Sequence, residues 1–508
     1  MVLSISLNFA RLDRSSLVDD EATYAVIAQN TLSSGIWYPL LYRGGRYTNK
    51  PPLVVWPVAV AFKLFGIGEF SARLPSAIAG VITIALIYAF GLMVLGRGWA
   101  LVPALLLASS VPWLTMHGVR SGASDSMLCL LMLLSVVLYL RFRLVGKVSS
   151  YYFAGAAVAL CALCKGLYVP TVFLVTATIW EFVLARSGAA NLSGVGSIGK
   201  PLDADAYSWF PRLVQTRGAH RSLQLPMFLY ISTAFIYALW MADNFFNVPD
   251  FMGKFAAQNF IRHTRGIVPG QLNHGLDYYP KVLVDAFGYW LLAIIPFVFK
   301  LFSGRHQNTP QDRVLWFAAI WALVVLVSIS CSASKSSWYL FPAFPAIAIL
   351  LGAGVRELAL RLSAQRVSLM GVCVCIVGIG LGLRAASVWQ VVTKPGRKVE
   401  MHVARDLIEN IPEARLYVGI FEKGAKIRPW NIFYASSGVP VMLVSRSELE
   451  TGCNIVLTDK SQFFGQYKGY DQSRVAKLKK TLETDQDLSL VDLCGGKFHE
   501  QFRQLQNS

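Results

Sequence analysis

Apolar and polar positions follow one another in long blocks along the first 390 residues. A transmembrane helix needs about 20 mainly apolar residues, and ten blocks reach or approach that length. They cover residues 73–96, 98–116, 125–141, 151–165, 167–185, 226–242, 282–302, 314–332, 338–355 and 367–388. The pattern predicts an α-helical protein that crosses a membrane many times.

The first 70 residues depart from this pattern. Residues 2–10 resemble the end of an apolar helix and are too short to span a bilayer, which suggests a truncated first helix. Residues 11–70 are more polar and are predicted to form a loop on the outer side. Within this loop, residues 52–62 are amphipathic but rich in proline, which disfavours a spanning helix. We expect this segment to lie on the membrane surface as a helix.

The last 115 residues have a different character. Charged residues become more frequent from about Lys394, and short β-rich runs alternate with polar helical stretches. These runs cover residues 416–421, 439–444 and 454–458. The sequence therefore predicts a membrane-embedded domain over residues 1–393 and an α/β domain outside the membrane over residues 394–508.

Composition agrees with a membrane environment. The chain of 508 residues is 55% hydrophobic and only 15% charged, with a net charge of +18, whereas soluble domains are about one quarter charged. Basic residues of membrane proteins collect in cytoplasmic loops, so we interpret the positive charge as a topology signal. Aromatic–basic interleaving and long basic runs are absent from the sequence, and nucleic acid is not a predicted partner.

Loop charge predicts the orientation. If the helices alternate in direction, one set of loops is basic throughout; it includes Arg97, then Arg141, Arg143 and Lys147. The other set mixes cations with acids and includes residues 20–68, 117–124 and 333–337. The positive-inside rule makes the first set cytoplasmic. The second set and the C-terminal domain are then extracytoplasmic.

Several ionisable residues lie at predicted membrane boundaries on the outer side. They are Asp20, Glu21, Lys50, Asp125, Lys165 and Lys335, and Arg262 lies in a long loop on the same side. Taken singly, each lysine could extend to the interface, and Asp125 could be a first-turn helix acid. Charge beside hydrocarbon is costly, however, so such groups usually face water or one another. Their common side favours one outward-facing site.

A site with carboxylates and cations suits one kind of chemistry. Lysine and arginine offset the charge of a phosphate-linked donor, and more strongly as the phosphate leaves. A carboxylate within hydrogen-bond reach accepts the proton of an acceptor hydroxyl. A lipid tail would lie between apolar helices.

Two motifs near the start resemble those of a known family. Residues 18–28, VDDEATYAVIA, resemble the D-E-x-x-Y-A-x-x-A opening of GT-C glycosyltransferases that use lipid-linked sugars. Residues 45–53, GRYTNKPPL, are similar to the R-Y-x-x-K-P-P-L stretch of the aminoarabinose (lipid A) transferases and protein mannosyltransferases. Further similar motifs follow in order, and the resemblance covers roughly residues 18–350.

The resemblance implies a fold and a set of site residues. The fold is an α-helical polytopic membrane protein of GT-C type with a C-terminal extracytoplasmic α/β domain. The implied residues are Asp20, Glu21 and Asp125 for catalysis, Lys50, Arg262, Lys165 and Lys335 for the donor phosphate, and Tyr47, Tyr24 and Arg120 for contacts to donor or acceptor. The sequence requires no cofactor. It leaves metal dependence open, because Asn49 stands where aminoarabinose transferases tend to have glutamate.

The predicted function is inverting transfer of a sugar from a polyprenyl-phosphate donor to an envelope acceptor. The acceptor is lipid A, a glycan or a protein at the outer face of the bacterial inner membrane. The alternative is a transporter or flippase of a lipid-linked sugar, which would place ionisable residues near the bilayer midplane and often shows inverted repeats. A relative with a decayed site also stays open. Clustering of the candidates at one boundary favours the enzyme.

Overall fold

A computed structural model gives the fold of the chain. It describes residues 1–115, 117–186, 224–261, 264, 274–302, 309–363, 367–393 and 433, and the five strands of a C-terminal sheet. Within these residues, six helices or helix runs are long and apolar enough to cross a membrane. The protein is thus a multi-pass helical membrane protein, as the sequence predicts.

Nine of the ten predicted blocks lie on helical segments in the described part of the chain. These segments are α4 (Glu69–Leu95), α7 (Asp125–Val145), α8 (Val148–Lys165), α9 (Tyr168–Arg186), α10 (Gln224–Asn247), α13 with η5 and α14 (Tyr278–Phe287, Gly288–Ala293, Ile294–Phe302), α15 (Pro310–Ser330), η6 with α16 (Ser337–Ala343, Phe344–Ser363) and α17 (Val367–Thr393). Gly146 ends α7 in the left-handed conformation, with φ of 72°, which glycine adopts without steric cost. The short turn that follows returns the chain as α8.

The prediction of one continuous span over residues 98–116 is wrong. The chain forms α5 (Leu101–Ala108) and α6 (Val111–Leu114), with Ser110 extended between them. Pro112 explains the break, because proline lacks an amide proton and clashes with the preceding turn. The carbonyl of Ser109, at the break, accepts a hydrogen bond from Arg384 Nε in α17 at 3.0 Å. Such a donor is needed because lipid cannot satisfy a free backbone group.

The first 70 residues form short elements at one end of the bundle. The predicted apolar stub is α1 (Val2–Phe9), followed by α2 (Asp19–Ser34) and a hairpin of β1 (Leu41–Tyr42) and β2 (Gly45–Arg46). The amphipathic segment is helical, as η1 (Pro52–Val54) and α3 (Trp56–Phe65). Its placement on a membrane surface stays a prediction.

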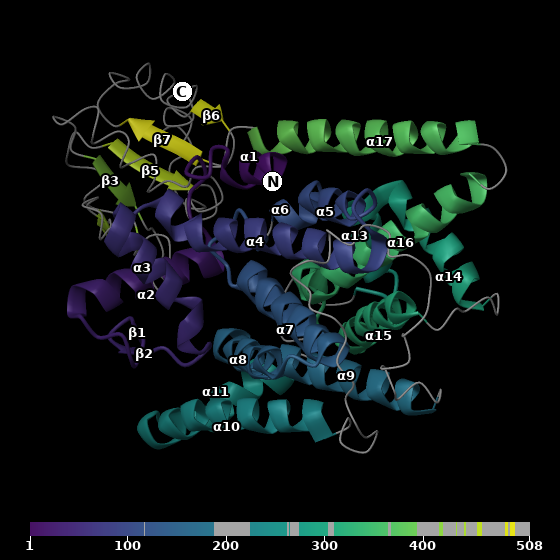
Figure 1. Cartoon of the computed structure of the whole chain (residues 1–508). Helices are drawn as coiled ribbons and strands as arrows, with labels where there is room; N and C mark the ends of the chain where they lie inside the picture. Colours follow the sequence, from purple (N-terminus) through teal and green to yellow (C-terminus); the bar gives the residue numbers. More distant parts are fainter. Residues whose placement is uncertain are drawn as a thin grey trace.

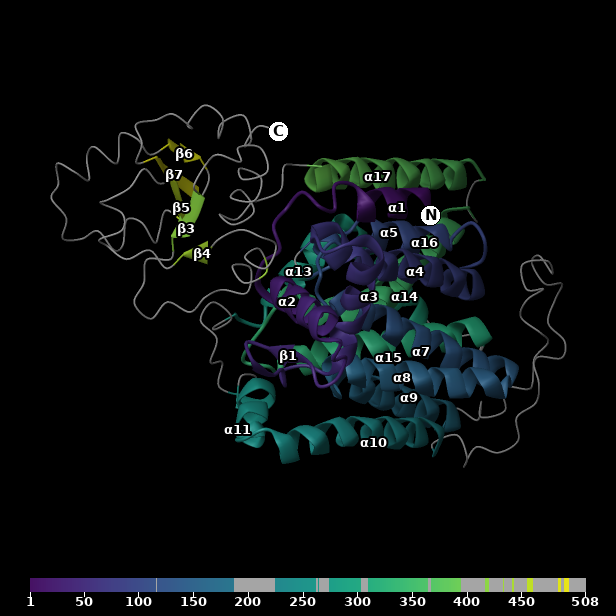
Figure 2. The same cartoon turned by 90° about the vertical axis from the view of Figure 1, so that its left-hand side faces the viewer.

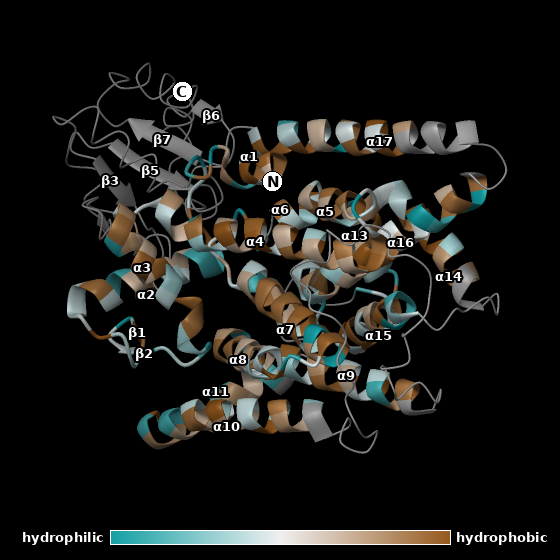
Figure 3. Cartoon of the chain, viewed as in Figure 1, coloured by the Kyte–Doolittle hydropathy of each residue, from teal (hydrophilic) through white to brown (hydrophobic). Residues whose placement is uncertain are grey.

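The long helices pack into one bundle with a continuous apolar core. Buried side chains of α4, α7, α15 and α16 belong to the same cluster, and hydrophobic residues predominate along the long helices (Figure 3). In contrast, α10 lies at the edge of the bundle, where it packs against α8 and α9 (Figure 1).

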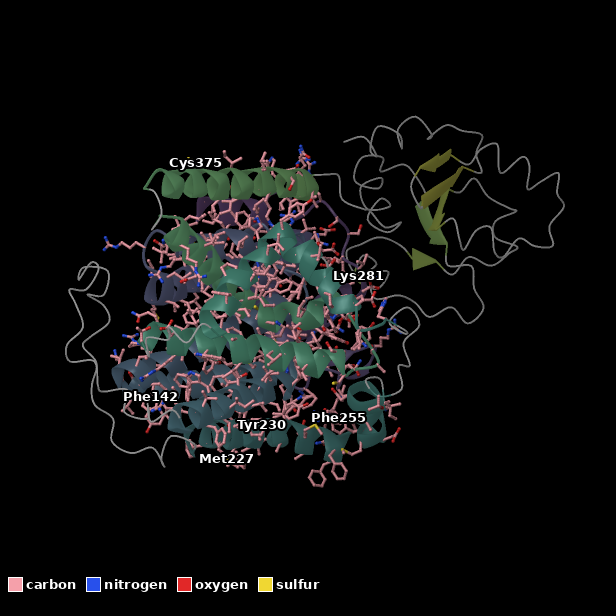
Figure 4. The ribbon with its side chains drawn as sticks, turned by 90° about the vertical axis from the view of Figure 1, so that its right-hand side faces the viewer. Phe142, Met227, Tyr230, Phe255, Lys281 and Cys375 are labelled. Carbon is pink, nitrogen blue, oxygen red and sulfur yellow. The ribbon has the colours of Figure 1, made fainter. Side chains whose placement is uncertain are left out.

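The two ends of the bundle differ. α2, the hairpin, α11 (Phe251–Ala256) and the C-terminal sheet lie at the same end, which we call the sheet end (Figure 2). Phe142 lies at the opposite end from Lys281 and Phe255 (Figure 4). Because Phe142 is near the C-terminus of α7, Asp125 at the N-terminus of that helix lies at the sheet end.

The C-terminal strands form one mixed sheet, and the predicted bounds of an α/β domain stay a prediction. The sheet has the order β4-β3-β5-β7-β6, with β3 (Leu416–Gly419) parallel to β4 (Val441–Met442) and β5 (Ile455–Asp459). The strands β7 (Leu488–Asp492) and β6 (Glu483–Asp485) complete it in antiparallel fashion. Each of the three predicted β-rich runs overlaps one of the parallel strands. The ring of Phe433 lies 6.3 Å from that of Phe62 in α3, so this part of the chain contacts the first loop.

Candidate active site

Glu21, in the first acidic motif, connects three parts of the fold through its hydrogen bonds. Its side chain is buried and accepts four hydrogen bonds. Arg73 of α4 donates two, from Nη2 to Oε1 at 2.8 Å and from Nε to Oε2 at 3.0 Å. The backbone amides of Val18 and Gly122 donate the others, at 3.2 and 2.9 Å. These donors fill the usual acceptor positions of a carboxylate, so Glu21 joins α2, α4 and the loop before α7.

Asp20 differs from its neighbour because its side chain is exposed. It lies close enough to Tyr24 and Tyr47 that its negative charge adds to burial in raising the pKa of both phenols. Tyr24 is one helical turn further along α2, and Tyr47 hydrogen bonds to it from the first loop. An accessible carboxylate thus lies beside two phenols that stay neutral at physiological pH.

Asp125 is buried in an ion pair. Its Oδ1 bonds to Lys165 Nζ at the C-terminus of α8, and its Oδ2 lies 3.6 Å from Nδ1 of His117. The α7–α8 turn makes this meeting possible, because it brings the first residue of α7 beside the last residue of α8. Asp20 also interacts electrostatically with Lys165. Asp20 therefore lies near the ion pair of Asp125 and Lys165, although the two aspartates are 105 positions apart in the sequence.

Further cations lie around this pair. Lys50 interacts electrostatically with Cys164, the residue before Lys165, and η1, which follows Lys50 closely, packs on α8. Lys335 is buried and donates to the Ser332 carbonyl at 2.7 Å, just before η6. η6 in turn packs on α7. The fold thus places three of the predicted phosphate ligands on or beside elements that pack against one another: Lys50, Lys165 and Lys335.

The Arg120 side chain binds the end of α1 and not the ion pair of Asp125 and Lys165. Its Nη1 donates to the carbonyls of Leu7 and Asn8 at 2.8 and 3.2 Å, at the C-terminus of α1. Burial, with a smaller effect of Arg73, lowers the pKa of Arg120 to about 10. A guanidinium is well suited to the last carbonyls of a helix, so Arg120 anchors the short α1. Arg262 lies outside the described residues.

His117 is a neighbour of the site that the sequence did not reveal. Its ring stacks on Trp338 of η6, with centroids 4.0 Å apart, and faces Asp125. Its backbone has φ of 64°, a conformation that non-glycine residues adopt rarely and that concentrates at functional sites. A histidine in an irregular loop has no periodic pattern, so only the three-dimensional structure identifies it.

The described residues contain no group of three or more histidine, cysteine, aspartate or glutamate side chains arranged to hold a metal ion. The ionisable side chains around Asp125 are instead a second carboxylate, lysines and the imidazole of His117. Such a set can bind a phosphate through its lysines and accept a proton through an exposed carboxylate.

The fold and the sequence both correspond to those of membrane glycosyltransferases of the GT-C class. The profile of the dolichyl-phosphate-mannose-protein mannosyltransferase family matches residues 49–193. The chain is 23% identical over 381 residues to an undecaprenyl phosphate-alpha-4-amino-4-deoxy-L-arabinose arabinosyl transferase of Aeromonas salmonicida, which covers 71% of this chain and 61% of the relative. The chain spans about 60% of the length of the curated relatives it matches.

Solved structures show the same fold. The crystal structure of ArnT from Cupriavidus metallidurans bound to undecaprenyl phosphate superposes with a TM-score of 0.62 over 96% of both chains, at 17% identity. An oligosaccharyltransferase of Archaeoglobus fulgidus gives a TM-score of 0.51 over 92% of this chain and 68% of that chain, at 15% identity. These matches confirm the resemblance to GT-C glycosyltransferases and the predicted fold.

Proposed function

We propose that this protein transfers a sugar from a polyprenyl-phosphate donor to an acceptor of the bacterial envelope, with inversion at the anomeric carbon. The observation that carries the proposal is that the exposed Asp20 lies near the buried ion pair of Asp125 and Lys165 at one end of the bundle. Relatives named as undecaprenyl-phosphate aminoarabinose transferases support this donor class. The resemblance of residues 45–53 to the aminoarabinose (lipid A) transferases makes lipid A, ahead of a glycan or protein, the first acceptor to test.

The proposed chemistry is a direct displacement. Asp20 accepts the proton of the acceptor hydroxyl, whose oxygen forms a bond to the anomeric carbon. The bond between that carbon and the phosphate oxygen breaks, and the polyprenyl phosphate leaves with the electron pair. Lys165, Lys50 and the predicted ligand Arg262 then meet the growing negative charge on phosphate. The transfer itself needs no resident cofactor in this proposal.

The three acidic residues have different roles in this proposal. Asp20 is the base because it is accessible and lies beside the cations. Asp125 orients Lys165, and an ion-paired, buried carboxylate is a poor proton acceptor because its charged form is stabilised. Glu21 holds the backbone that carries Asp20. Tyr47 and Tyr24 are neutral hydrogen-bond donors for the donor sugar or phosphate.

We propose that the sheet end faces outward from the bacterial inner membrane. Support comes from Arg141, Arg143 and Lys147, which lie in and after the last turns of α7, at the opposite end of the bundle. Basic residues remain on the cytoplasmic side. The acidic site and the C-terminal domain are then extracytoplasmic, where a lipid-linked donor and an envelope acceptor meet.

Asp20→Asn tests the proposed base. We expect transfer from an undecaprenyl-phosphate sugar to fall at least about 100-fold, the usual contribution of a general base, with the variant still folded in the membrane. Product formation is measured by mass spectrometry of lipid A. Asp13→Asn, at another exposed carboxylate of the first loop, is the matched control and keeps activity. Full activity of Asp20→Asn would refute the assignment.

A further inference from the structure

A second charged cluster ties the first loop to α10. Asp243 lies one turn before the end of α10, and its Oδ2 is 3.0 Å from Nη1 of Arg46 in β2. The Tyr38 hydroxyl donates to the same oxygen, and Nδ2 of Asn247 donates to Oδ1 at 3.0 Å. We call these four residues the Asp243 cluster. The residues of its ion pair are 197 positions apart, so the tertiary structure alone creates it.

The cluster fixes the segment that carries two predicted site residues. Arg46 directly precedes Tyr47, and Lys50 follows four positions after Arg46. On its other side the hairpin is held to α2, where Asn30 Nδ2 donates to the Leu41 carbonyl at 3.1 Å. The hairpin therefore bridges α2, which carries Asp20, and α10.

The position of Asp243 on α10 adds a second link. Through its packing on α8, α10 is also linked to Lys165, another predicted phosphate ligand, at the C-terminus of α8. The helix lies at the edge of the bundle, where it packs mainly on α8 and α9 (Figure 1). A contact between Arg46 and Asp243 therefore ties the loop of Tyr47 and Lys50 to a helix that packs against the helix of Lys165.

We infer that Arg46 and Asp243 are positioning residues for donor binding, which they support by holding the loop of Tyr47 and Lys50 against α10. This inference rests on the proposed function, because it takes the donor phosphate as the ligand of Lys50. The ion-pair side chains are about one third exposed, at 29% and 33%. Pairs of this exposure contribute little to overall stability. Their removal should consequently loosen the loop without unfolding the bundle.

Charge exchange at this pair tests the inference. Asp243→Arg and Arg46→Asp are made singly and together, and binding of undecaprenyl phosphate to the full-length protein in detergent is measured. Each single variant places like charges opposite each other, so we expect binding to weaken by about fivefold or more, while the double variant recovers most of it. Asp277→Lys with Lys281→Asp is the control pair, since it exchanges an exposed i,i+4 ion pair of α13 at the same end.

The outcomes separate this inference from the proposed function. Weakened singles with recovery in the double variant, and an inert control pair, support the inference. Singles that bind like the wild type, or a double variant that stays weak, overturn it while the proposed function stands. A wild type that does not bind undecaprenyl phosphate overturns the proposed function, and the inference with it. Thermal midpoints of all variants are expected to stay close to that of the wild type, and a large fall in the singles alone would identify a purely structural pair.

Discussion

The distinction between Asp20 and Glu21 leads to a prediction that separates catalysis from scaffolding. Replacing Glu21 by glutamine keeps the shape of the side chain but removes its charge. Its amide nitrogen would then face Arg73 in either orientation, together with the backbone amide of Val18 or of Gly122. Buried Arg73 would then lose the carboxylate that accepts two of its hydrogen bonds. We expect Glu21→Gln to destabilise the protein strongly and to affect turnover less than Asp20→Asn.

The magnitude follows from the remaining partners of Arg73. Removing one member of a buried ion pair costs about 3–5 kcal/mol. The Arg73 guanidinium keeps hydrogen bonds to the carbonyls of Leu12, Ser15 and Ser16 at 2.8 to 3.0 Å. These acceptors compensate part of the lost interaction energy of Arg73. We therefore expect Glu21→Gln to lower the free energy of unfolding by about 3 kcal/mol, the lower end of that range.

Unfolding in mixed detergent micelles measures this loss, and transfer is assayed per folded molecule below the unfolding midpoint. Glu357→Gln is the matched control, because Glu357 pairs with Arg361 at the surface at 2.9 Å. Loss of an exposed pair of this kind costs about 0.5 kcal/mol or less. The reasoning is refuted if Glu21→Gln unfolds like the wild type yet loses transfer as completely as Asp20→Asn, since Glu21 would then act on the substrate.

Two further predictions concern the cations of the site. Lys50→Ala is expected to raise KM for the lipid-linked donor about tenfold with little change in the free energy of unfolding, because charge-assisted hydrogen bonds to phosphate are lost. Lys63→Ala, at an exposed lysine of α3, is the control. An unchanged donor KM for Lys50→Ala would exclude the phosphate role. Asp125→Asn and Lys165→Ala are each expected to reduce kcat/KM by about 100-fold or more, and the double variant to be little worse than either single one, because the pair acts as a unit. Additive losses in that kinetic cycle would show that Asp125 and Lys165 act independently.

Prediction from sequence succeeded where one physical constraint governs many residues. Nine of the ten predicted apolar blocks coincide with helical segments of the described chain, and the β-rich runs marked the three parallel strands. It failed at residues 98–116, where hydropathy is high throughout. Pro112 indicates a break in the helix, but the apolar composition of the block favoured a continuous span. Hydropathy indicates whether a segment prefers lipid to water, whereas backbone geometry decides whether that segment forms one continuous helix.

Roles of single polar residues were less predictable. Asp20 and Glu21 are adjacent, yet one is exposed and the other accepts four hydrogen bonds. Buried Glu181 of α9 pairs with Arg143 and accepts a hydrogen bond from the Tyr139 hydroxyl at 2.7 Å, both in α7. This network has no counterpart in the sequence pattern. Each of these assignments depends on a partner from a distant segment.

The sequence by itself determined that the chain is a multi-pass membrane protein, where its helices run and which motifs resemble GT-C glycosyltransferases. These properties are local, because a run of side chains partitions into lipid according to its own composition. Only the tertiary structure decided that Asp125 pairs with Lys165, that Arg120 anchors α1, and that His117 and Asp243 lie where they do. The physical reason is that the state and role of a charged group depend on the charges and donors packed around it, and folding brings these together from distant parts of the chain.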